Sequence, residues 1–314
     1  MTHLTIAYFT NRPDPKIQWF FDSLRRECNG DYSGIKIVVV DFFNSLRDIV
    51  RESGFDGNSG LRTASAVSPK PCVWQGAHRL TTTEFFAASN ARNTAICLAP
   101  DGWIAFVDDL SVLMPGWLNA VREAMAANEI VFGAYKKVKK LKVIDGEVTE
   151  FEAFHGGVDS RWNQGGNGPV RAAGSWLFGC SLAAPVQAFL DINGFPEICD
   201  SLGMEDCAAG MMLERAGYRF RYDRRMLTLE SEEDHQQLPV FRREDPYRGD
   251  PHAKPRDDMS HAVLRIIAGR SSHPGYWGPG GISELRQQIL AGKPFPIVQI
   301  PEHRWFDAKR LSEL

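Results

Sequence analysis

The chain has 314 residues, of which 43% are hydrophobic and 24% are charged, and its formal net charge is −3. These values are typical of a globular protein with one large domain, or with one domain and an appendage. The small negative charge excludes a global positive field for nucleic acid, although a local basic patch is compatible with it. No apolar run approaches the ~18 residues that cross a membrane.

The first half of the chain alternates apolar runs with segments of helical periodicity. Three apolar runs predict buried strands of a mostly parallel sheet: residues 4–10, 35–40 and 103–107. Helical spacing of apolar residues predicts helices over residues 17–24 and 85–98. Residues 53–83, rich in Gly, Ser, Thr and Pro, predict an irregular crossover. This order favours right-handed crossovers and a doubly wound sheet.

The second half contains shorter elements. The pattern predicts helices over residues 115–127, 185–192, 205–216, 260–269 and 282–291. It predicts strands over residues 130–134, 218–222 and 226–229, and a charged hairpin over 136–149. Residues 155–175 are rich in glycine, and their length favours a functional loop over a plain connection. From residue 231 the composition shifts to charges, prolines and histidines.

The six cysteines form no Cys-X-X-Cys pair, and several of them lie in apolar runs. Buried free thiols in a reducing compartment are the better interpretation, because disulfide frameworks belong mainly to secreted chains. Residues 1–4 lack the basic region and apolar stretch of a signal peptide. We therefore expect a soluble, cytoplasmic protein.

Two acidic steps carry most of the chemical information. The apolar run Ile104–Val107 ends on Asp108-Asp109, and Glu205-Asp206 opens a predicted helix 97 residues beyond Asp109. Carboxylates at the end of a buried strand lie where open α/β sheets bind their ligands. If the second acidic pair lies in the same crevice, the two pairs would have different roles. One pair would bind a metal or a ligand hydroxyl, and the other would transfer a proton.

These motifs resemble a known family. Ala-Ser-Asn-Ala-Arg-Asn at 88–93, the strand ending on Asp108-Asp109, and Pro-Gly-Trp-Leu at 115–118 resemble the core of GT-A glycosyltransferases, particularly the family-two group. Phe-Gly-Cys-Ser at 178–181, Asn-Gly-Phe-Pro-Glu at 193–197 and Gly-Met-Glu-Asp at 203–206 continue the likeness, which covers residues 4–230. The resemblance implies an α/β GT-A domain over residues 1–240. Its mixed, mostly parallel sheet is flanked by helices, and a partly helical extension follows over 241–314.

The resemblance also implies an activity: inverting transfer of a sugar from a nucleotide-diphosphate donor, a UDP-sugar being favoured, to an acceptor hydroxyl. It places Thr10, Arg12, Asp41, Arg92 and Asp108 beside the donor. A guanidinium suits phosphate or ligand hydroxyls. An alternative stays open for two of these residues. Asp41 would then be a turn residue or a helix cap, and Arg92 would form a salt bridge that holds its helix.

The metal motif departs from the family. Mn²⁺ or Mg²⁺ takes one or two carboxylates and fills its remaining positions with water and diphosphate. The family pattern is Asp-X-Asp, but Leu110 occupies the third position here. We expect Asp109 to take the metal role and His235 to supply a further ligand. The alternatives are weak or absent metal binding, and a solvent-exposed histidine.

The resemblance assigns Asp206 as the general base, which accepts the proton of the acceptor hydroxyl during attack. Glu205 would contact an acceptor hydroxyl. Without the flanking motifs, both residues would be interpreted as acidic groups favouring a helix N-terminus. Trp176 is a candidate for stacking on an acceptor sugar, or else a core residue. The lysine run 136–140 is a solvated hairpin face or a contact for a phosphorylated or nucleic-acid acceptor.

Three other functions are alternatives to sugar transfer. Nucleotidyl transfer uses a similar fold, but the Gly-rich loop bearing Arg and Lys that it needs after the first strand is absent from this sequence. A non-catalytic sugar-nucleotide-binding module is compatible with Leu110 in the metal motif. A viral transferase that glycosylates hydroxylated DNA bases is compatible with the unusual tail. The sequence leaves the acceptor open.

Overall fold

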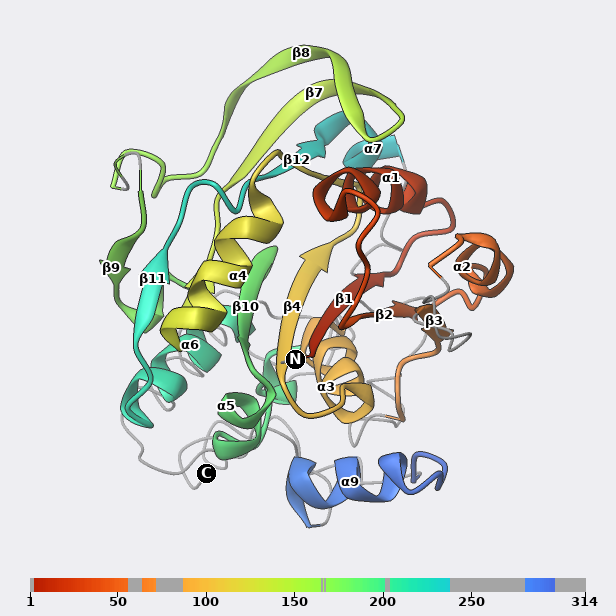
Figure 1. The fold of residues 1–314 in the computed structure, drawn as a ribbon, viewed down its shortest axis with the longest axis vertical. Coiled ribbons are helices and arrows are strands. Elements are labelled where there is room, and N and C mark those ends of the chain that lie inside the picture. Colours follow the sequence, from red (N-terminus) through yellow and green to blue (C-terminus); the bar gives the residue numbers. More distant parts are fainter. Residues whose placement is uncertain are drawn as a thin grey trace, which may run out of the picture.

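The computed structural model describes residues 3–55, 64–71, 87–164, 166, 168–200, 204–237 and 280–296. Its centre is an eight-stranded sheet of order β3-β2-β1-β4-β10-β6-β11-β9 (Figure 1). The strands are β1 (Leu4–Thr10), β2 (Ile35–Asp41), β3 (Ala64–Val67), β4 (Trp103–Asp108), β6 (Ile130–Phe132), β9 (Val170–Ala172), β10 (Ser181–Pro185) and β11 (Phe220–Tyr222). Only β10 and β9 run antiparallel to their neighbours in this sheet. The predicted fold class, a mixed and mostly parallel sheet flanked by helices, is confirmed.

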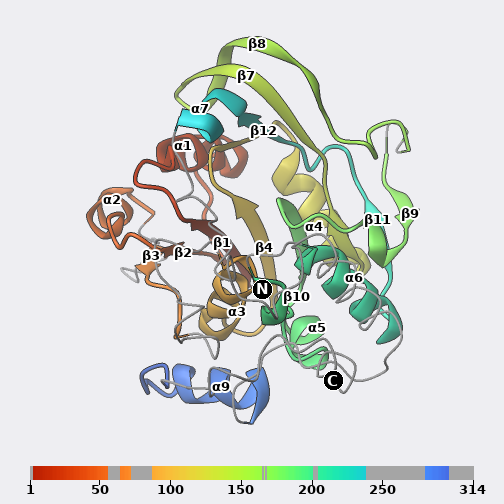
Figure 2. The ribbon, with the colours of Figure 1, turned by 180° about the vertical axis from the view of Figure 1, so that it is seen from behind.

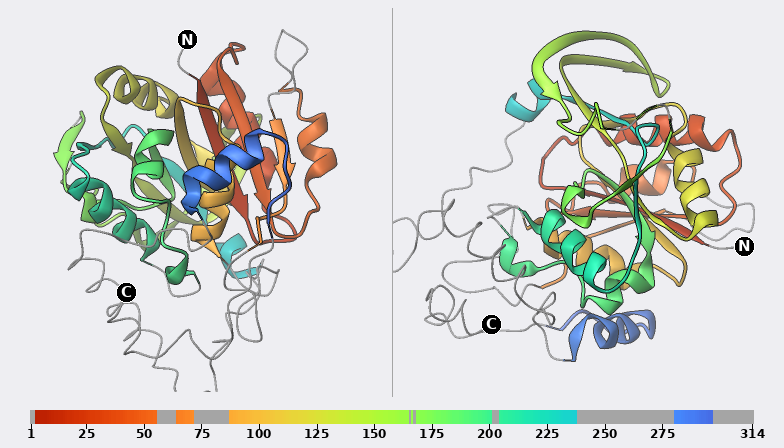
Figure 3. Two further views of the ribbon diagram at one scale, coloured as in Figure 1. Left: turned by 90° about the horizontal axis from the view of Figure 1, so that it is seen from below. Right: turned by 90° about the vertical axis from the view of Figure 1, so that its left-hand side faces the viewer.

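Helices cover both faces of the sheet (Figures 2 and 3). One face packs against α1 (Ile17–Cys28), α2 (Arg47–Glu52) and α4 (Trp117–Ala127). The other packs against α3 (Ala88–Leu98), α5 (Val186–Asp191), α6 (Glu205–Arg215) and α9 (Gly281–Leu290). In β1, Ile6 and Tyr8 face the α1 side, whereas Ala7 and Phe9 face the α3 side. Burial on both faces explains why the strand is apolar throughout.

A second, four-stranded sheet lies beside the carboxyl end of β4, with order β5-β12-β7-β8 (Figure 1). Its elements are β5 (Ser111–Leu113), β12 (Thr228–Ser231), β7 (Tyr135–Ile144) and β8 (Glu147–Val158), and α7 (Glu232–Gln237) follows β12. The predicted hairpin around Asp145-Gly146 is confirmed as β7–β8. It is longer than expected, because β8 continues to Val158.

Two sequence predictions are corrected. The predicted crossover 53–83 contains the strand β3, and the helix α2 precedes it. β3 has four residues with no alternation of buried and exposed positions, so no period identifies it. The glycine-rich segment 155–175 is not one loop, because it holds the end of β8, the strand β9 and the 3₁₀ turn η1 (Gly174–Trp176). Gly203 and the predicted helix 260–269 lie outside the described residues.

The predicted helix 282–291 is confirmed as α9, which packs on α3. Asn193 Oδ1 accepts the backbone N–H of Ile282 at the start of α9, at 2.8 Å. Arg286 Nη2 donates to the carbonyl of Ala99 at 2.8 Å, just past the end of α3. The helix that carries Arg92 is therefore held from outside by a segment far along the chain. The domain boundary at residue 240 stays a prediction.

Several cysteines are buried in the described part of the chain. Cys28, Cys97, Cys180 and Cys207 are buried free thiols, and Cys72 lies outside the described ranges. Burial raises the pKa of Cys97 to about 12. Among the described helices, none is both long and apolar enough to cross a membrane.

Candidate active site

The candidate donor residues meet at the carboxyl ends of three parallel strands. Thr10 of β1 pairs in register with Asp41 of β2, and Phe9 pairs with Asp108 of β4. Side chains at this edge of a parallel sheet share one crevice, which is where α/β folds bind ligands. The structure thus brings together side chains that the sequence separates by up to 98 residues (108 minus 10).

Arg92 of α3 links the two acidic steps. Its Nη1 donates to Glu205 Oε1 at 2.7 Å, and its Nη2 lies 3.6 Å from Asp108 Oδ1. The guanidinium lies over the rings of Phe9 and Phe195, with its Cζ 4.7 and 5.3 Å from their centroids. Stacking between aromatic faces suits the planar guanidinium and restrains its position. The two acidic pairs therefore lie close together, as expected. Arg92 joins them, because it forms a salt bridge with Glu205 and lies near Asp108.

The backbone at Gly179 leaves room for this arginine. A Cβ atom at position 179 would lie 2.1 Å from Arg92 Nη2, which is far inside van der Waals contact. Gly179 also donates its backbone N–H to Asp206 Oδ2 at 2.9 Å. A single glycine in the Phe-Gly-Cys-Ser segment thus contacts both the arginine and the candidate base.

Glu205 and Asp206 are adjacent but have different surroundings. Glu205 pairs directly with Arg92, whereas Asp206 accepts the backbone N–H groups of Gly179 at 2.9 Å and of Cys207 at 2.7 Å. Burial first and the Glu205 charge second raise the pKa of Asp206 above its ordinary value. A carboxylate with a raised pKa is a stronger proton acceptor, and its ion-paired neighbour is not.

Asp108 occupies an electrostatically costly position at the end of β4. Its Oδ1 is buried and has no hydrogen-bond partner in the described part of the chain, although 36% of the side chain is exposed. Desolvation raises the pKa of Asp108 to about 7, with Arg92 opposing the shift and the charge of Glu230 adding to it. A positive ligand group at this position would relieve the unsatisfied oxygen.

Asp109 is engaged by residues that follow β1. Thr10 Oγ1 donates to Asp109 Oδ2 at 2.7 Å, and Arg12 Nε lies 3.0 Å from the same oxygen. Arg12 Nη2 lies 2.9 Å from Nδ1 of His235 at the other end of its guanidinium. The two predicted metal ligands therefore both contact Arg12. A cation bound by Asp109 and His235 together would require this guanidinium to move.

The third position of the metal motif is filled by a turn residue. Leu110 has φ 59°, in the left-handed region, and its side chain is fully buried. Its backbone N–H donates to the carbonyl of Pro15 at 3.2 Å. This conformation reverses the chain between β4 and β5 within two residues. Among the described residues, no group of three or more His, Cys, Asp or Glu side chains is assembled to hold a metal ion.

Glu230 is a site residue that the sequence prediction missed. It lies in β12, is 4% exposed, and its Oε2 is 3.5 Å from His235 Nε2. When Arg12 donates to Nδ1, the ring proton of neutral His235 lies on Nε2 and faces this carboxylate. Glu230 Oε1 is buried with no hydrogen-bond partner in the described ranges. The only available signal was a charged residue directly after a predicted strand that ended at Leu229.

Asp41 and Trp176 both have structural roles in the fold. Asp41 is buried, and it accepts the backbone N–H groups of Phe43 at 2.9 Å and Leu46 at 2.8 Å. It therefore organises the turn after β2, and its contact with the donor stays a prediction. Trp176 lies in η1, half-buried against the core on the α6 side, and its contact with an acceptor also stays a prediction.

The predicted lysine run lies on β7, and two of its four lysines pair with acidic residues. Lys137 Nζ is 3.3 Å from Glu232 and Lys139 Nζ is 2.5 Å from Glu152. This pairing favours a solvated hairpin face. Such exposed pairs contribute little to stability.

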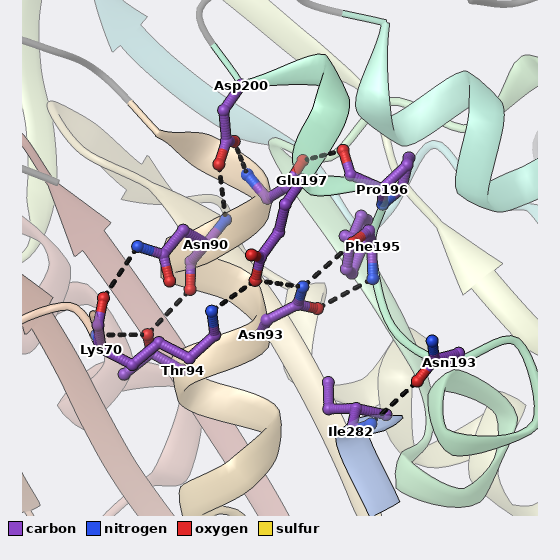
Figure 4. A network of polar contacts seen from close by, with 11 residues as sticks. Lys70, Asn90, Asn93, Thr94, Asn193, Phe195, Pro196, Glu197, Asp200 and Ile282 are labelled. Carbon is purple, nitrogen blue, oxygen red and sulfur yellow. Dashed lines mark hydrogen bonds and ion pairs between the residues drawn. The ribbon is translucent and has the colours of Figure 1, made fainter. Parts of the chain in front are cut away.

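A buried polar network supports the site from behind (Figure 4). Lys70 Nζ lies 2.5 Å from Glu197 Oε1 with both side chains fully buried, and Asn93 donates to the same oxygen at 3.0 Å. Asp200 accepts the backbone N–H of Asn90 at 3.3 Å, near the start of α3. These contacts fix α3 against the segment that leads into α6.

Comparisons with known proteins agree on the fold. The chain is similar to the crystal structure of S. aureus TarS 1–349 in complex with UDP, with a TM-score of 0.50, 12% identity, and coverage of 85% of this chain and 70% of that one. A second structure of TarS 1–349 gives a TM-score of 0.49 at 12% identity, covering 94% and 93% of the two chains. No protein-family model matches the sequence, and a search of curated proteins finds no match. At 12% identity, the likeness establishes a shared fold.

Proposed function

We propose that this protein is a glycosyltransferase that moves a sugar from a nucleoside-diphosphate donor, a UDP-sugar being favoured, to an acceptor hydroxyl with inversion. The fold is that of a glycosyltransferase crystallised with UDP. The observation that carries the proposal is the Arg92 bridge, because it joins a donor-side carboxylate to the acidic step that opens α6. A transferase needs these two functions within one site.

The two arginines are the proposed contacts for the donor. Arg92 and Arg12 are fixed cations at the strand edge, each held by carboxylates and each 4% exposed or less. A guanidinium binds phosphate oxygens through paired N–H groups, and its charge is retained at any working pH. We assign both to stabilising the negative charge that develops on the leaving diphosphate. Thr10, Asp41 and Asp108 are the proposed contacts for the nucleoside and ribose.

Asp206 is the proposed general base. In inversion, the acceptor oxygen attacks the anomeric carbon from the side opposite the leaving diphosphate, and the hydroxyl proton passes to a carboxylate. Two backbone N–H groups orient Asp206 without neutralising it, and its pKa is raised. Glu205 remains paired with Arg92, so its proposed role is to position that arginine and to contact the acceptor. Trp176 stays the proposed acceptor-stacking residue.

Mn²⁺ or Mg²⁺ remains the cofactor predicted from the sequence. The residues as they stand do not fit it well, because Arg12 lies between Asp109 and His235. A divalent ion would supply charge neutralisation of the diphosphate, which is also the role proposed for Arg12. No catalytic step is therefore assigned to the metal.

A panel assay tests the proposal. Wild-type protein and Asp206→Asn are incubated with several nucleotide sugars and candidate acceptors, and products are identified by mass spectrometry with and without EDTA. Transfer by the wild type and its loss in the variant, with UDP binding retained in both, is the expected result. A wild type that binds UDP but turns over no donor would support the rival binding module. Modified nucleobases among the products would identify the DNA-glycosylating alternative.

A further inference from the structure

Three arginines gather at the far edge of the central sheet. Arg171 of β9 pairs directly opposite Arg221 of β11 in the antiparallel ladder. Arg219 precedes Arg221 by two residues, so both point to the same side of the sheet. This is the side that α4 covers, because Val131, the register partner of Arg221 on β6, belongs to the core cluster around α4.

Their positive charge is only partly neutralised. Glu129 Oε2 lies 3.3 Å from Arg221 Nε, and Glu129 Oε1 lies 3.9 Å from Arg219 Nη1. Arg171 has no ion-pair partner within the ranges that the structure describes. Like charges directly opposite each other across two strands destabilise a sheet. Three cations and one carboxylate therefore leave an excess of positive charge at a position where it weakens the fold.

The same side chains line a hollow. It has a volume of about 200 Å³, and its walls include the three arginines, Glu129 and Phe220. Protection of an edge strand by charge explains one arginine on β9. It does not explain Arg221, which belongs to the interior strand β11, or Arg219, which directly precedes that strand and lines the same hollow. Several guanidinium groups that line one small cavity are well suited to bind an oxyanion, because each offers paired N–H donors and a fixed positive charge.

The hollow is separate from the candidate active site. β6 and β11 run parallel to β4, because β10 is antiparallel to both β4 and β6. Glu129 and Arg219 precede their strands and lie at the amino-terminal edge of the sheet. Asp108 and Asp109 lie at the carboxyl-terminal edge of β4. The arginines therefore do not serve the diphosphate of the donor.

We propose that Arg171, Arg219 and Arg221 form a second anion site that binds a phosphate group. The group is either free inorganic phosphate or the phosphate ester of a larger ligand, since both present the same oxygens to a guanidinium. Occupation would neutralise the like-charged pair and stabilise the edge formed by β9 and β11. The site is independent of sugar transfer, and its test needs no donor or acceptor.

Titration with inorganic phosphate and, separately, with dimethyl phosphate tests the site by calorimetry at constant ionic strength. The variant Arg171→Gln/Arg219→Gln leaves the Arg221–Glu129 pair intact, so the fold is retained. Its phosphate affinity is expected to be about tenfold weaker than that of the wild type. Arg47→Gln is the matched control, because Arg47 is exposed on α2, away from this edge, and its affinity stays unchanged.

A third variant changes affinity in the opposite direction. Glu129→Gln removes the carboxylate that competes for the arginines, and tighter phosphate binding is expected. Binding of dimethyl phosphate as well as phosphate would assign the site to a diester-bearing ligand, and binding of phosphate alone to the free ion or a monoester. Equal phosphate affinity in the wild type, the double variant and Glu129→Gln would overturn the proposal. It would place any bound phosphate elsewhere, for example at Arg12.

Discussion

Arg92 donates to Glu205 over 2.7 Å while its guanidinium is stacked on two aromatic rings and its Nη2 lies 3.6 Å from Asp108 Oδ1. One side chain therefore connects the carboxyl end of β4 to the first turn of α6. A buried ion pair of this kind contributes little net stability compared with apolar residues, but breaking it is costly. The connection is thus better explained by the geometry it imposes on the site than by the stability it adds.

Arg92→Met should lower the free energy of unfolding by about 3 kcal/mol, because it leaves the largely buried Glu205 and the partly buried Asp108 without their cation. Urea denaturation measures the change. Arg92→Met/Glu205→Gln should recover part of the loss, since it removes a charge that has lost its partner. Arg47→Met on exposed α2 is the control and should change little. A loss below 1 kcal/mol in Arg92→Met would contradict the arrangement.

Gly179→Ala should reduce transfer activity by about 100-fold with the fold retained, because the new methyl group would displace the Arg92 guanidinium. Steady-state kinetics and circular dichroism measure the two quantities. Gly166→Ala is the matched control, since a Cβ atom there meets nothing within 4 Å. Equal activity in both variants would show that Arg92 is not needed at its observed position.

Asp206→Asn should lower kcat by about 10²- to 10⁴-fold, the usual contribution of a general base, while nucleotide affinity changes little. Pre-steady-state and steady-state assays with a saturating UDP-sugar separate the two effects. Glu205→Gln is the neighbouring control and should affect donor affinity as well, because Arg92 loses its ion-pair partner. An Asp206→Asn variant with full kcat would exclude Asp206 as the base.

The pH dependence follows from the same carboxyl group. A general base acts in its ionised form, and the pKa of Asp206 is raised by burial and by Glu205. Activity should therefore fall as pH decreases through a pKa above 3.8, and this acid limb should be absent from the residual activity of Asp206→Asn. Asp108, with a pKa of about 7, also titrates in this direction. Asp108→Asn removes its contribution, and an acid limb in kcat must persist in that variant.

The sequence predicts the parts of this fold that are buried on both sides. β1, β2 and β4 are apolar throughout because helices pack on both faces, and such runs are recognisable without structural knowledge. β3 and β9 are edge strands of three or four exposed and half-buried residues, and nothing in their pattern separates them from loops. Pairing of β12 with β5 and β7 joins segments about 100 residues apart, which no local period can show.

The sequence identified several residues of the candidate site, but it did not predict which side chains contact one another there. The strand that ends on Asp108 and the resemblance to GT-A glycosyltransferases predicted one site for Asp108, Glu205 and Arg92, and the structure brings these side chains together. The sequence could not reveal that Arg12 pairs with Asp109, because that contact depends on where the chain turns after β1. Glu230 was missed for a related reason. Glu230 is buried beside His235, and that contact depends on how the chain folds after β12, which no local pattern shows.

The Lys70–Glu197 pair behind the site (Figure 4) allows a test of the supporting network. Lys70→Met should destabilise the fold by about 3–5 kcal/mol, because it removes the cation that lies 2.5 Å from the fully buried carboxylate of Glu197. Lys70→Met/Glu197→Gln should lie much closer to the wild type, since glutamine still accepts the Asn93 bond. Chemical denaturation of both variants gives the comparison. A double variant as unstable as the single one would contradict this account.

Arg12 occupies the position where a metal ion would have to bind. Its guanidinium lies between Asp109 and His235, so it competes with any cation for the same two side chains. Arg12→Gln should therefore bind Mn²⁺ more tightly than the wild type at pH 8, a pH chosen because burial raises the pKa of Asp109. Electron paramagnetic resonance of free Mn²⁺ measures the affinity, and Arg47→Gln is the charge-matched control. The same variant should lose affinity for UDP, because it removes a cation proposed to contact the diphosphate. If Arg12→Gln bound Mn²⁺ no more tightly than the wild type, Asp109 and His235 would not be a cation site. If it also kept full affinity for UDP, Arg12 would have no part in donor binding.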